Sequence, residues 1–325
     1  LSSLWGELLA LPVDRLSMDD SFFDLGGHSM LLSMLMLRVR EQFGGGFTLG
    51  HFLEVPTIRT LATLLEKGER PDAPFAQAIR DAQRKWVINT LTQDRAGDPR
   101  KVIVTGANSF VGSHIVEALL AGGATQVACL VREEPGNTAM ARFTEALREY
   151  RLAHLDLSRV HVFAADISQP QLGLSREVYD ALAEDFGALV HNAARVNHVL
   201  DYLSLARDNV DPIFECLRLC ETRSKKVFNF VSTLSASSSI NSRGQVLETP
   251  AAATLPLYIK NGYNLSKWVA ERQLGGALAQ GAWVNIYRPG NISFNSRNGV
   301  CQPQKNRLML MLKGSLQLGL LPHLD

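Results

Sequence analysis

The chain has 325 residues, of which 46% are hydrophobic and 20% are charged, and its formal net charge at pH 7 is +1. This composition is ordinary for a soluble globular protein, and the length predicts about two domains of roughly 150 residues each. The near-neutral charge gives no support for a nucleic-acid or anionic-membrane partner, and no apolar stretch approaches the roughly 20 residues of a membrane span. No signal-peptide pattern precedes the first helix, so we expect a cytoplasmic protein, and the absence of a starting Met suggests an excised fragment.

The four cysteines, Cys129, Cys216, Cys220 and Cys301, are scattered, and only Cys216 and Cys220 share a helix face. No histidine completes a metal-ligand spacing around them, and the eight histidines form no paired motif. We therefore expect buried free thiols in a reducing compartment, and no metal site.

Residues 1 to 67 contain three segments typical of short helices. The segment "LSSLWGELLAL" is amphipathic, "SMLLSMLMLRVREQF" follows a pair of glycines, and "PTIRTLATLLEKG" begins with Pro and ends at Gly, as helices prefer. We expect a four-helix domain with a small core here. Residues 68 to 98 are rich in Pro, Asp and Arg and predict a linker with one helix in its middle.

From residue 99 to residue 325 the pattern changes to alternating strands and helices. The segments "KVIVTG", "TQVACLV", "RVHVFAADI", "ALVHNAA" and "KKVFNFVSTL" predict strands, and helical segments such as "SHIVEALLAGG" and "LARDNVDPIFECLRLCE" separate most of them. This alternation predicts right-handed crossovers and a doubly wound α/β domain, in which helices cover both faces of a parallel sheet.

The stretch "VIVTGANSFVGSHIVEALL" places Gly106 and Gly112 between a strand and a helix. In the Rossmann dinucleotide fingerprint the first glycine makes a tight turn, the third permits close packing of helix on sheet, and the helix N-terminus binds the pyrophosphate. Ser109 replaces the middle glycine, which normally lets the backbone approach the phosphates. The Ser109 hydroxyl is a candidate donor in place of that contact.

The end of the second predicted strand indicates which cofactor is preferred. An NAD enzyme has Asp or Glu about twenty residues after the fingerprint, where this chain has Arg132. A guanidinium suits a 2′-phosphate through bidentate charge-assisted hydrogen bonds, and Arg142 can join it from the following helix. We therefore expect NADPH. Glu133 and Glu134 keep NAD open, and the other alternative is that Arg132 is only a solvated charge at a strand end.

The stretch "YNLSK" places Tyr263 and Lys267 at i and i+4, on one face of a helix. A phenol with an ordinary pKa of about 10 becomes a better proton donor and acceptor near neutral pH when an ammonium group lies beside it. Upstream, the fifth predicted strand ends in "FVSTLSA", where Thr233 is the candidate partner hydroxyl and Ser232 and Ser235 are the fallbacks. The alternative for these hydroxyls is a turn that caps the strand.

In order along the chain, "TGANSFVG", "LVR", "AADI", "HNAA", "DNV", "VST", "YNLSK" and "RPGNI" resemble the extended short-chain dehydrogenase/reductase superfamily over about residues 101 to 325. The resemblance implies a catalytic triad of Thr233, Tyr263 and Lys267. It also implies a bond from Lys267 to the nicotinamide ribose.

The same resemblance assigns cofactor contacts. Asp166 and Ile167 are expected at the adenine, the segment after the fourth strand beside the cofactor, and "PGNI" near the nicotinamide. Taken alone, Asp166 is also typical of a helix cap, and Asn192 of a strand-end turn. With the glycine turn and the arginines, the expected cofactor-binding residues are Thr105, Gly106, Ser109, Phe110, Val111, Gly112, Arg132, Arg142, Asp166, Ile167, Asn192, Ala193, Ala194, Tyr263, Lys267, Pro289, Gly290, Asn291 and Ile292.

The stretch "DDSFFDLGGHSMLLSMLM" places Ser29 after two glycines, at the start of an apolar helix. From its residues alone, it is a loop with glycines at positive φ and Ser29 as a helix N-cap. It closely resembles the attachment motif of peptidyl carrier proteins, and this resemblance, over about residues 1 to 67, implies that the Ser29 hydroxyl carries 4′-phosphopantetheine. A helix N-terminus tolerates the negative charge of the phosphate, and a phosphopantetheinyl transferase is an implied partner.

A carrier followed by an extended short-chain reductase resembles the terminal pair of nonribosomal peptide synthetases, as well as carboxylic acid and aminoadipate reductases. The resemblance implies NADPH-dependent release of an acyl or peptidyl thioester, tethered on Ser29, as an aldehyde or, after a second reduction, an alcohol. It also implies upstream synthetase modules as partners. Two other functions stay open: an epimerase- or dehydratase-like enzyme acting on a nucleotide sugar, and a domain that binds or cyclises the chain without reducing it. Extended members build most of their substrate subdomain after "RPG", so we expect this subdomain to be incomplete.

Overall fold

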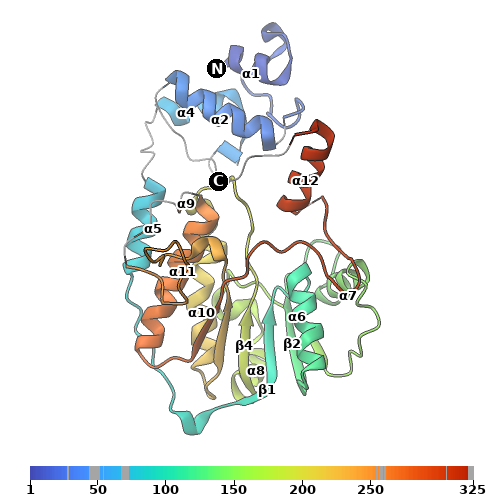
Figure 1. Cartoon of the computed structure of the whole chain (residues 1–325), viewed down its shortest axis with the longest axis vertical. Coiled ribbons are helices and arrows are strands. Elements are labelled where there is room, and N and C mark those ends of the chain that lie inside the picture. The colour runs from blue at the N-terminus through green and yellow to red at the C-terminus, as the bar shows by residue number, and fades with distance from the viewer. Residues whose placement is uncertain are drawn as a thin grey trace.

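The computed structural model describes residues 1–27, 29–43, 52–53, 55–66, 73–253, 255, 259, 261–304 and 306–320. A small helical domain lies at one end of the molecule, and an α/β domain built around a sheet forms the rest (Figure 1). The order of these two parts along the chain is the one that the sequence predicts.

The small domain is organised around Trp5, which is fully buried. The rings of Phe22 and Phe52 pack edge-on against it at centroid distances of 5.0 and 6.4 Å, and such aromatic pairs add to the stability that burial provides. Residues 44–51 and 54 lie outside the described residues. The helices that the structure describes in this domain fall where the sequence predicts them: α1 (Ser2–Leu9), α2 (Ser29–Phe43) and α4 (Ile58–Glu66), with a short 3-10 helix at Val13–Arg15.

The segment that the sequence predicts as a linker is attached to the α/β domain. Its helix, α5 (Ala73–Gln83), packs along α9 (Tyr202–Asn209) and α11 (Gly262–Ala279). The Tyr202 hydroxyl donates to Asp81 Oδ2 at 2.6 Å, and Gln273 Nε2 of α11 donates to the Asp81 carbonyl at 3.1 Å. The helix predicted in the middle of this segment is therefore present and fixed, while the limits of the segment at residues 68 and 98 stay a prediction.

The sheet has six parallel strands in the order β3-β2-β1-β4-β5-β6. This is the doubly wound order, in which the crossovers change direction between β1 and β4 and ligands bind outside the carboxyl ends of those strands. The fold class predicted from the sequence is therefore confirmed. The strands are β1 (Asp98–Thr105), β2 (Gln126–Val131), β3 (Val160–Ala164), β4 (Phe186–His191), β5 (Val227–Val231) and β6 (Val284–Tyr287).

Alternate residues of the strands face two separate cores. On one face Val102 and Val104 pack with residues of α6 (Phe110–Ala121) and α7 (Ala139–Glu149). On the other face Ile103 packs with residues of α8 (Arg176–Asp185), α10 (Asp211–Cys220) and α11. Because β1 is central and covered on both sides, its last four residues are all buried, as expected of a parallel sheet.

Two elements differ from the sequence prediction. The edge strand β6 is not among the predicted strands; it has four residues, and none of its side chains is fully buried. The helix predicted across "LARDNVDPIFECLRLCE" is divided into α9 and α10 at Val210, two residues before Pro212, which lacks the backbone N–H that a continuous helix would need. The last described helix is α12 (Arg307–Leu318), and within the described part of the chain no helix is long and apolar enough to cross a membrane.

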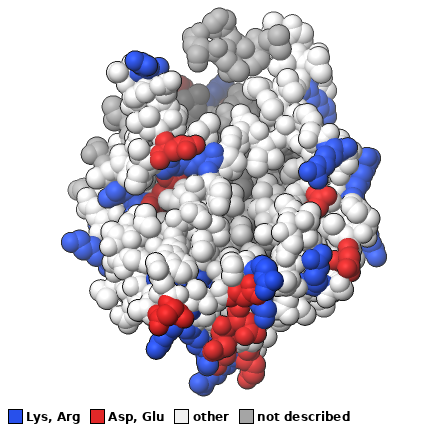
Figure 2. Space-filling model, turned by 60° about the horizontal axis from the view of Figure 1, so that its bottom comes forward, with Lys and Arg blue, Asp and Glu red and all other residues white. Residues whose placement is uncertain are grey.

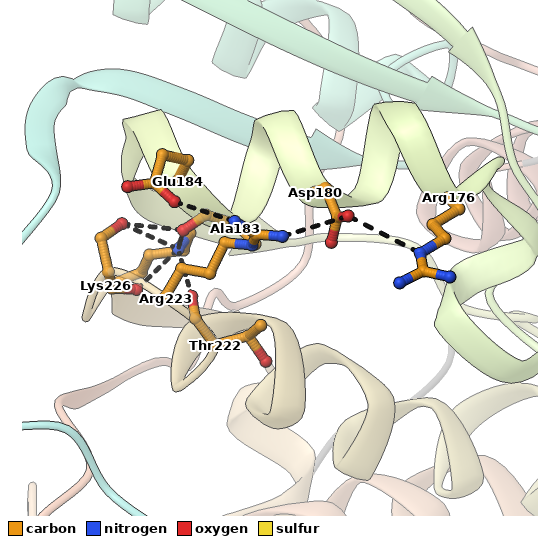
Figure 3. A network of polar contacts seen from close by, with 8 residues as sticks. Arg176, Asp180, Ala183, Glu184, Thr222, Arg223 and Lys226 are labelled. Atoms are coloured by element: carbon orange, nitrogen blue, oxygen red, sulfur yellow. Dashed lines mark hydrogen bonds and ion pairs between the residues drawn. The ribbon is translucent and has the colours of Figure 1, made fainter.

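A buried lysine fastens α8 to the start of β5, at the amino edge of the sheet. Lys226 Nζ donates to the carbonyl oxygens of Ala183 and Ser224, both at 2.7 Å (Figure 3). Beside it, Arg223 pairs with Asp180 at 3.1 Å. Burial lowers the pKa of Lys226 to about 8. Figure 2, in which this end of the molecule is turned forward, shows Lys and Arg beside Asp and Glu in mixed groups.

Candidate active site

The turn between β1 and α6 has the shape that a dinucleotide requires. Gly106 has φ +62°, and a Cβ at this residue would lie 2.8 Å from the Cα of Ala193. A Cβ at Gly112 would lie 2.1 Å from the carbonyl oxygen of Gly106. Only glycine fits at either position, so the backbone closes tightly here and directs the N-terminus of α6, which begins at Phe110 with Val111 next, toward the carboxyl edge of the sheet. These residues fit a pyrophosphate, because free N–H groups and the helix dipole favour an anion at this point.

Ser109, the residue that departs from the fingerprint, caps α6. Its Oγ accepts from Gly112 N at 3.0 Å and donates to the carbonyl oxygen of Gly106 at 2.9 Å. Asn192 Nδ2 donates to Ser109 Oγ at 3.0 Å and to Gly106 O at 3.2 Å. The Ser109 hydroxyl therefore closes the turn from within, and its hydrogen is directed at the Gly106 carbonyl rather than at the space above the turn.

The ends of β1 and β4 are joined by a buried pair, Thr105 and His191. Thr105 Oγ1 lies 2.9 Å from His191 Nδ1 and accepts from the backbone N–H groups of Asn192 and Ala193 at 3.2 and 3.1 Å. Full burial lowers the pKa of His191 to about 3, so the imidazole is neutral at physiological pH. These bonds fix the segment from Asn192 to Ala194 against the glycine turn, as expected for residues that border the cofactor.

Arg132 and Arg142 are brought together at the end of β2. Arg142 donates to the carbonyl oxygen of Arg132 and pairs with Glu134 at 2.6 Å, while Glu133 accepts from the N–H of Ala139 at 3.2 Å. The two acidic residues that would favour NAD are thus engaged with their own loop. The Arg132 side chain is exposed, which leaves its guanidinium in solvent at the end of β2.

Asp166 and Ile167 follow β3, next to this arginine. Asp166 Oδ1 accepts from the N–H and the hydroxyl of Ser168 at 3.0 and 2.8 Å. Burial opposes ionisation of the carboxyl, but these hydrogen bonds and the nearby Arg132 outweigh it and lower the pKa of Asp166. Ile167 is partly buried against the core below. Asp166 therefore shapes the turn after β3, and this role is compatible with one at the adenine.

The hydroxyls at the end of β5 have different surroundings. Ser232 is buried and donates to Glu271 Oε1, so its hydroxyl is occupied within the protein. Thr233 is half-buried at the start of the next 3-10 turn, where its Oγ1 accepts weakly from Ser235 N at 3.4 Å, and Ser235 is exposed. Among the contacts that the structure describes, only Ser232 has a strong internal partner for its hydroxyl, and Thr233 differs from Ser235 in being half-buried.

Tyr263 and Lys267 lie on the first turns of α11, whose N-cap is Asn261. The Tyr263 ring meets the ring of His198 edge-on at 5.3 Å, and burial raises the pKa of Tyr263. Lys267 is buried, donates to the carbonyl oxygen of Val231 at 2.8 Å, and has its pKa lowered to about 7, because desolvation outweighs the attraction of Glu271. The expected lowering of the phenol pKa by the ammonium is therefore not seen here. The lysine nitrogen is held on the strand end instead.

Three polar residues that support this site were not singled out by the sequence reasoning. Glu271 accepts from Arg288 Nη2 at 2.6 Å in the interior, and Asn209 Nδ2 donates to Ser266 Oγ at 3.0 Å and to Arg195 O at 3.1 Å. Asn209 lies in the "DNV" motif, and Glu271 lies one turn after Lys267; these placements were the available signals.

The segment "PGNI" follows β6 and passes from the catalytic edge toward α12. Pro289 O accepts from the N–H of Leu234 at 2.9 Å, and Asn306 donates to Ile292 O. Gly290 and Asn291, between them, are exposed. The segment is therefore anchored at both ends, by Leu234 next to Thr233 at one end and by Asn306 before α12 at the other.

The small domain contacts the α/β domain next to Tyr263. Leu200 and Leu205 are buried in the same apolar cluster as the core of the helical domain, and Tyr263 is partly buried against it. Figure 1 shows the helical domain lying over the end of the α/β domain where α9 and α11 come closest to it. Ser29 is the first residue of α2; its side chain and His28 lie outside what the structure describes.

The fold defines a class of protein: a small helical domain joined to a Rossmann-type α/β domain with a glycine turn between β1 and α6. The family of NAD-binding domains described as male sterility protein matches residues 104–325, and the family described as phosphopantetheine attachment site matches residues 1–65. The first match spans more than half of the chain, and the chain therefore belongs to this NAD-binding family, with a phosphopantetheine attachment domain before it.

Proteins similar to this chain match one or both of its parts. The chain is 30% identical over 332 residues to a component of the linear gramicidin synthase of Brevibacillus parabrevis, covering 97% of this chain and 6% of that protein. The terminal R domain from the myxalamid PKS-NRPS pathway is 31% identical, with a TM-score of 0.65 over 77% of this chain and 64% of that one. A thiolation-reductase di-domain from an archaeal nonribosomal peptide synthetase shares the fold, at 22% identity and a TM-score of 0.64 over 98% of this chain and 68% of that one. The predicted carrier-plus-reductase pair of the nonribosomal peptide synthetase type is thus confirmed, and the chain spans a small part of such a synthetase.

Proposed function

We propose that this chain releases an acyl or peptidyl thioester from its own carrier domain by reducing it to an aldehyde, with NADPH as the reductant. The observation that carries the proposal is the shared apolar cluster of the two domains, which places the carrier against Leu200, Leu205 and Tyr263. A thioester held on the phosphopantetheine arm of Ser29 would then reach the catalytic residues within one chain, at an effective concentration that capture from solution does not provide.

The residues of the site support a reduction in which the hydride, the protons and the broken bond are all accounted for. When bound, the reduced nicotinamide would supply a hydride. As the thioester carbonyl carbon accepts that hydride, its oxygen gains negative charge, and Tyr263 donates a proton to it while the Thr233 hydroxyl donates a hydrogen bond. The product is a hemithioacetal. Its carbon–sulfur bond then breaks, the sulfur takes the hydroxyl proton, the aldehyde leaves, and the free thiol stays on the carrier.

The raised pKa of Tyr263 suits this direction. Because burial keeps the phenol protonated at neutral pH, the group has a proton to give when the oxyanion forms. Lys267, whose pKa lies near 7, would supply positive charge beside the reacting oxygen below that pH, and would bond the ribose as the superfamily resemblance implies.

The preference for NADPH rests on the end of β2. Arg132 is exposed there, and Arg142 neutralises Glu134 at 2.6 Å, so the acidic group that would repel a 2′-phosphate is already paired. A guanidinium binds phosphate through two parallel hydrogen bonds, an interaction that NADH lacks.

The test is single-turnover release from the loaded chain. Ser29 is loaded with an acyl-pantetheine by a phosphopantetheinyl transferase, and the loss of NADPH is followed together with the product mass. We expect one NADPH consumed per acyl chain and an aldehyde product, a second NADPH only where the alcohol is formed, and no turnover for Ser29→Ala. NADPH binding without consumption, or release of a carboxylic acid or a cyclised product, would contradict the proposal.

A further inference from the structure

A single buried carboxylate joins three segments of the catalytic site. The side chain of Glu271, on α11, is 0% exposed. Ser232, at the end of β5, donates to Oε1, and Arg288, at the end of β6, donates to Oε2 at 2.6 Å and through Nε to both oxygens at 3.1 Å. A fully bonded carboxylate of this kind holds its partners in one arrangement.

Each partner of Glu271 is one residue away from a functional position. Ser232 precedes Thr233, and Arg288 precedes Pro289 of the expected nicotinamide loop. Arg288 Nη2 also donates to the carbonyl oxygen of Thr249 at 3.0 Å, so the chain approaching α11 is tied to the same centre. The position of Thr233 relative to α11 therefore depends on Glu271.

Glu271 also sets the charge around Lys267, which lies one helical turn earlier. The ammonium nitrogen of Lys267 is 4.6 Å from the centre of the Phe230 ring and bonds only to the Val231 carbonyl among the contacts that the structure describes. Glu271 is the anionic group that favours the charged lysine against desolvation. Arg288, in turn, neutralises part of the charge of Glu271.

Among the described residues, the other titratable groups on the elements near Lys267 are either neutral or already engaged with another side chain. His191 of β4 and Cys216 of α10 are buried, and burial holds the first neutral and raises the pKa of the second. On α9, Asp208 pairs with Arg195 at 3.3 Å, and on α5, Asp81 accepts from Tyr202. Tyr263, on α11 itself, has a raised pKa through burial.

We propose that Glu271 is a positioning residue for the reduction, which aligns the Thr233 strand end with the Tyr263 helix and provides the counter-charge for Lys267. The inference rests on the proposed reductase function but concerns only residues of this chain. Glu271 and Arg288 have opposite effects on the charge of Lys267. Loss of the Glu271 carboxylate removes the negative charge that attracts the Lys267 ammonium, whereas loss of the Arg288 guanidinium leaves that negative charge less neutralised.

The test compares Glu271→Gln with Arg288→Gln. The titration of Lys267 is followed by carbon-13 NMR of lysine labelled at Cε, with the resonance assigned by its absence in Lys267→Met, and the pH profile of kcat is measured on the loaded chain. We expect the pKa of Lys267 and the alkaline limb of kcat to fall by on the order of one unit in Glu271→Gln and to rise in Arg288→Gln. In Glu271→Asp, which keeps the charge, the pKa of Lys267 is expected to equal that of the wild type. If Glu271→Gln does not fold, the comparison of Glu271→Asp with Arg288→Gln tests the proposal.

A matched control is available at the other end of β5. Glu221 pairs with Lys225 at 3.3 Å, with both side chains 3% exposed and the same i,i+4 spacing. Glu221→Gln therefore removes a similarly buried carboxylate from a lysine, and we expect it to lower stability without moving the titration of Lys267. If both catalytic-site variants leave that titration unmoved, or shift it in the same direction, the positioning role is overturned. The titration needs no turnover, so a wild type that fails to reduce its thioester contradicts the proposed function alone.

Discussion

Asn192 Nδ2 donates to Ser109 Oγ at 3.0 Å and so ties the residue after β4 to the N-cap of α6. The serine also accepts from Gly112 N, so one hydroxyl joins the glycine turn, the helix start and the neighbouring strand end. Where the fingerprint has a conformationally free glycine, this chain thus has Ser109, whose side chain links the turn after β1 to the end of β4. These are the two strands between which the crossover direction changes.

We predict that Ser109→Ala lowers the free energy of unfolding by about 1 kcal/mol, because it removes the N-cap of α6 and the partner of Asn192. Ser109→Gly is expected to cost only a few tenths of a kcal/mol, since glycine is tolerated at a cap. Urea denaturation of both variants measures the difference. An unchanged free energy of unfolding in Ser109→Ala would show that the hydroxyl does not act as a cap.

We predict that Arg132→Gln reduces kcat/KM with NADPH by roughly tenfold or more, the loss expected for a charge-assisted hydrogen bond, and leaves kcat/KM with NADH nearly unchanged. The reason is that only NADPH carries the phosphate that the guanidinium would bind. Steady-state kinetics with both cofactors provide the measurement. Arg148→Gln, in the last turn of the same helix as Arg142, is the control and should change neither value.

The contact between the domains predicts a different response for tethered and free substrates. Leu200→Ala should slow reduction of the thioester carried on Ser29 more than reduction of a free acyl-pantetheine thioester, because it weakens docking of the carrier. Leu182→Ala removes a similarly buried leucine, 1% exposed against 3%, from α8 and is expected to affect both substrates alike. A Leu200→Ala variant that lost activity equally on both substrates would contradict the docking role.

Because Lys226 is buried, we predict that the free energy of unfolding rises with pH. Its pKa is about 8 in the folded chain against an ordinary 10.5, so between these values the unfolded chain binds more protons and the free energy of unfolding increases with pH. The penalty of burying the ammonium is present in full below about pH 8 and is lost by about pH 10.5. Relative to Lys226→Met, the wild type should gain on the order of 2–3 kcal/mol across this window, measured by urea denaturation at its two ends. A difference that does not change with pH would rule out the buried ammonium as its cause.

The central strands could be predicted because they are covered on both faces and are mostly buried. Runs such as "KVIVTG" and "TQVACLV" are rich in β-branched residues, and they correspond to β1 and β2. The strand β6 escaped prediction because "VNIY" is short, lies at the sheet edge and mixes half-buried with exposed residues. Its pattern is too brief to distinguish from a loop.

The candidate site divides in the same way. Glycines and the Tyr263–Lys267 spacing are recognisable because backbone geometry and helix periodicity require those residues at fixed intervals. Glu271 and Arg288 are ordinary surface residue types, and only the fold shows that they meet in the interior, where one is 0% and the other 13% exposed. The hydrogen-bond partner of the Lys267 ammonium could not be predicted from the sequence either, because the acceptor, Val231 O, lies on a different element of the fold.

The most direct test of the account is the fate of deuterium. The chain, loaded on Ser29 with an acyl-pantetheine, is given NADPH that carries deuterium at both C4 positions, and the released product is weighed by mass spectrometry. The account predicts an aldehyde with a single deuterium on its carbonyl carbon and a free thiol on the carrier, and a severe loss of release in Tyr263→Phe. A product without deuterium, or full NADPH-dependent release by Tyr263→Phe, would contradict it.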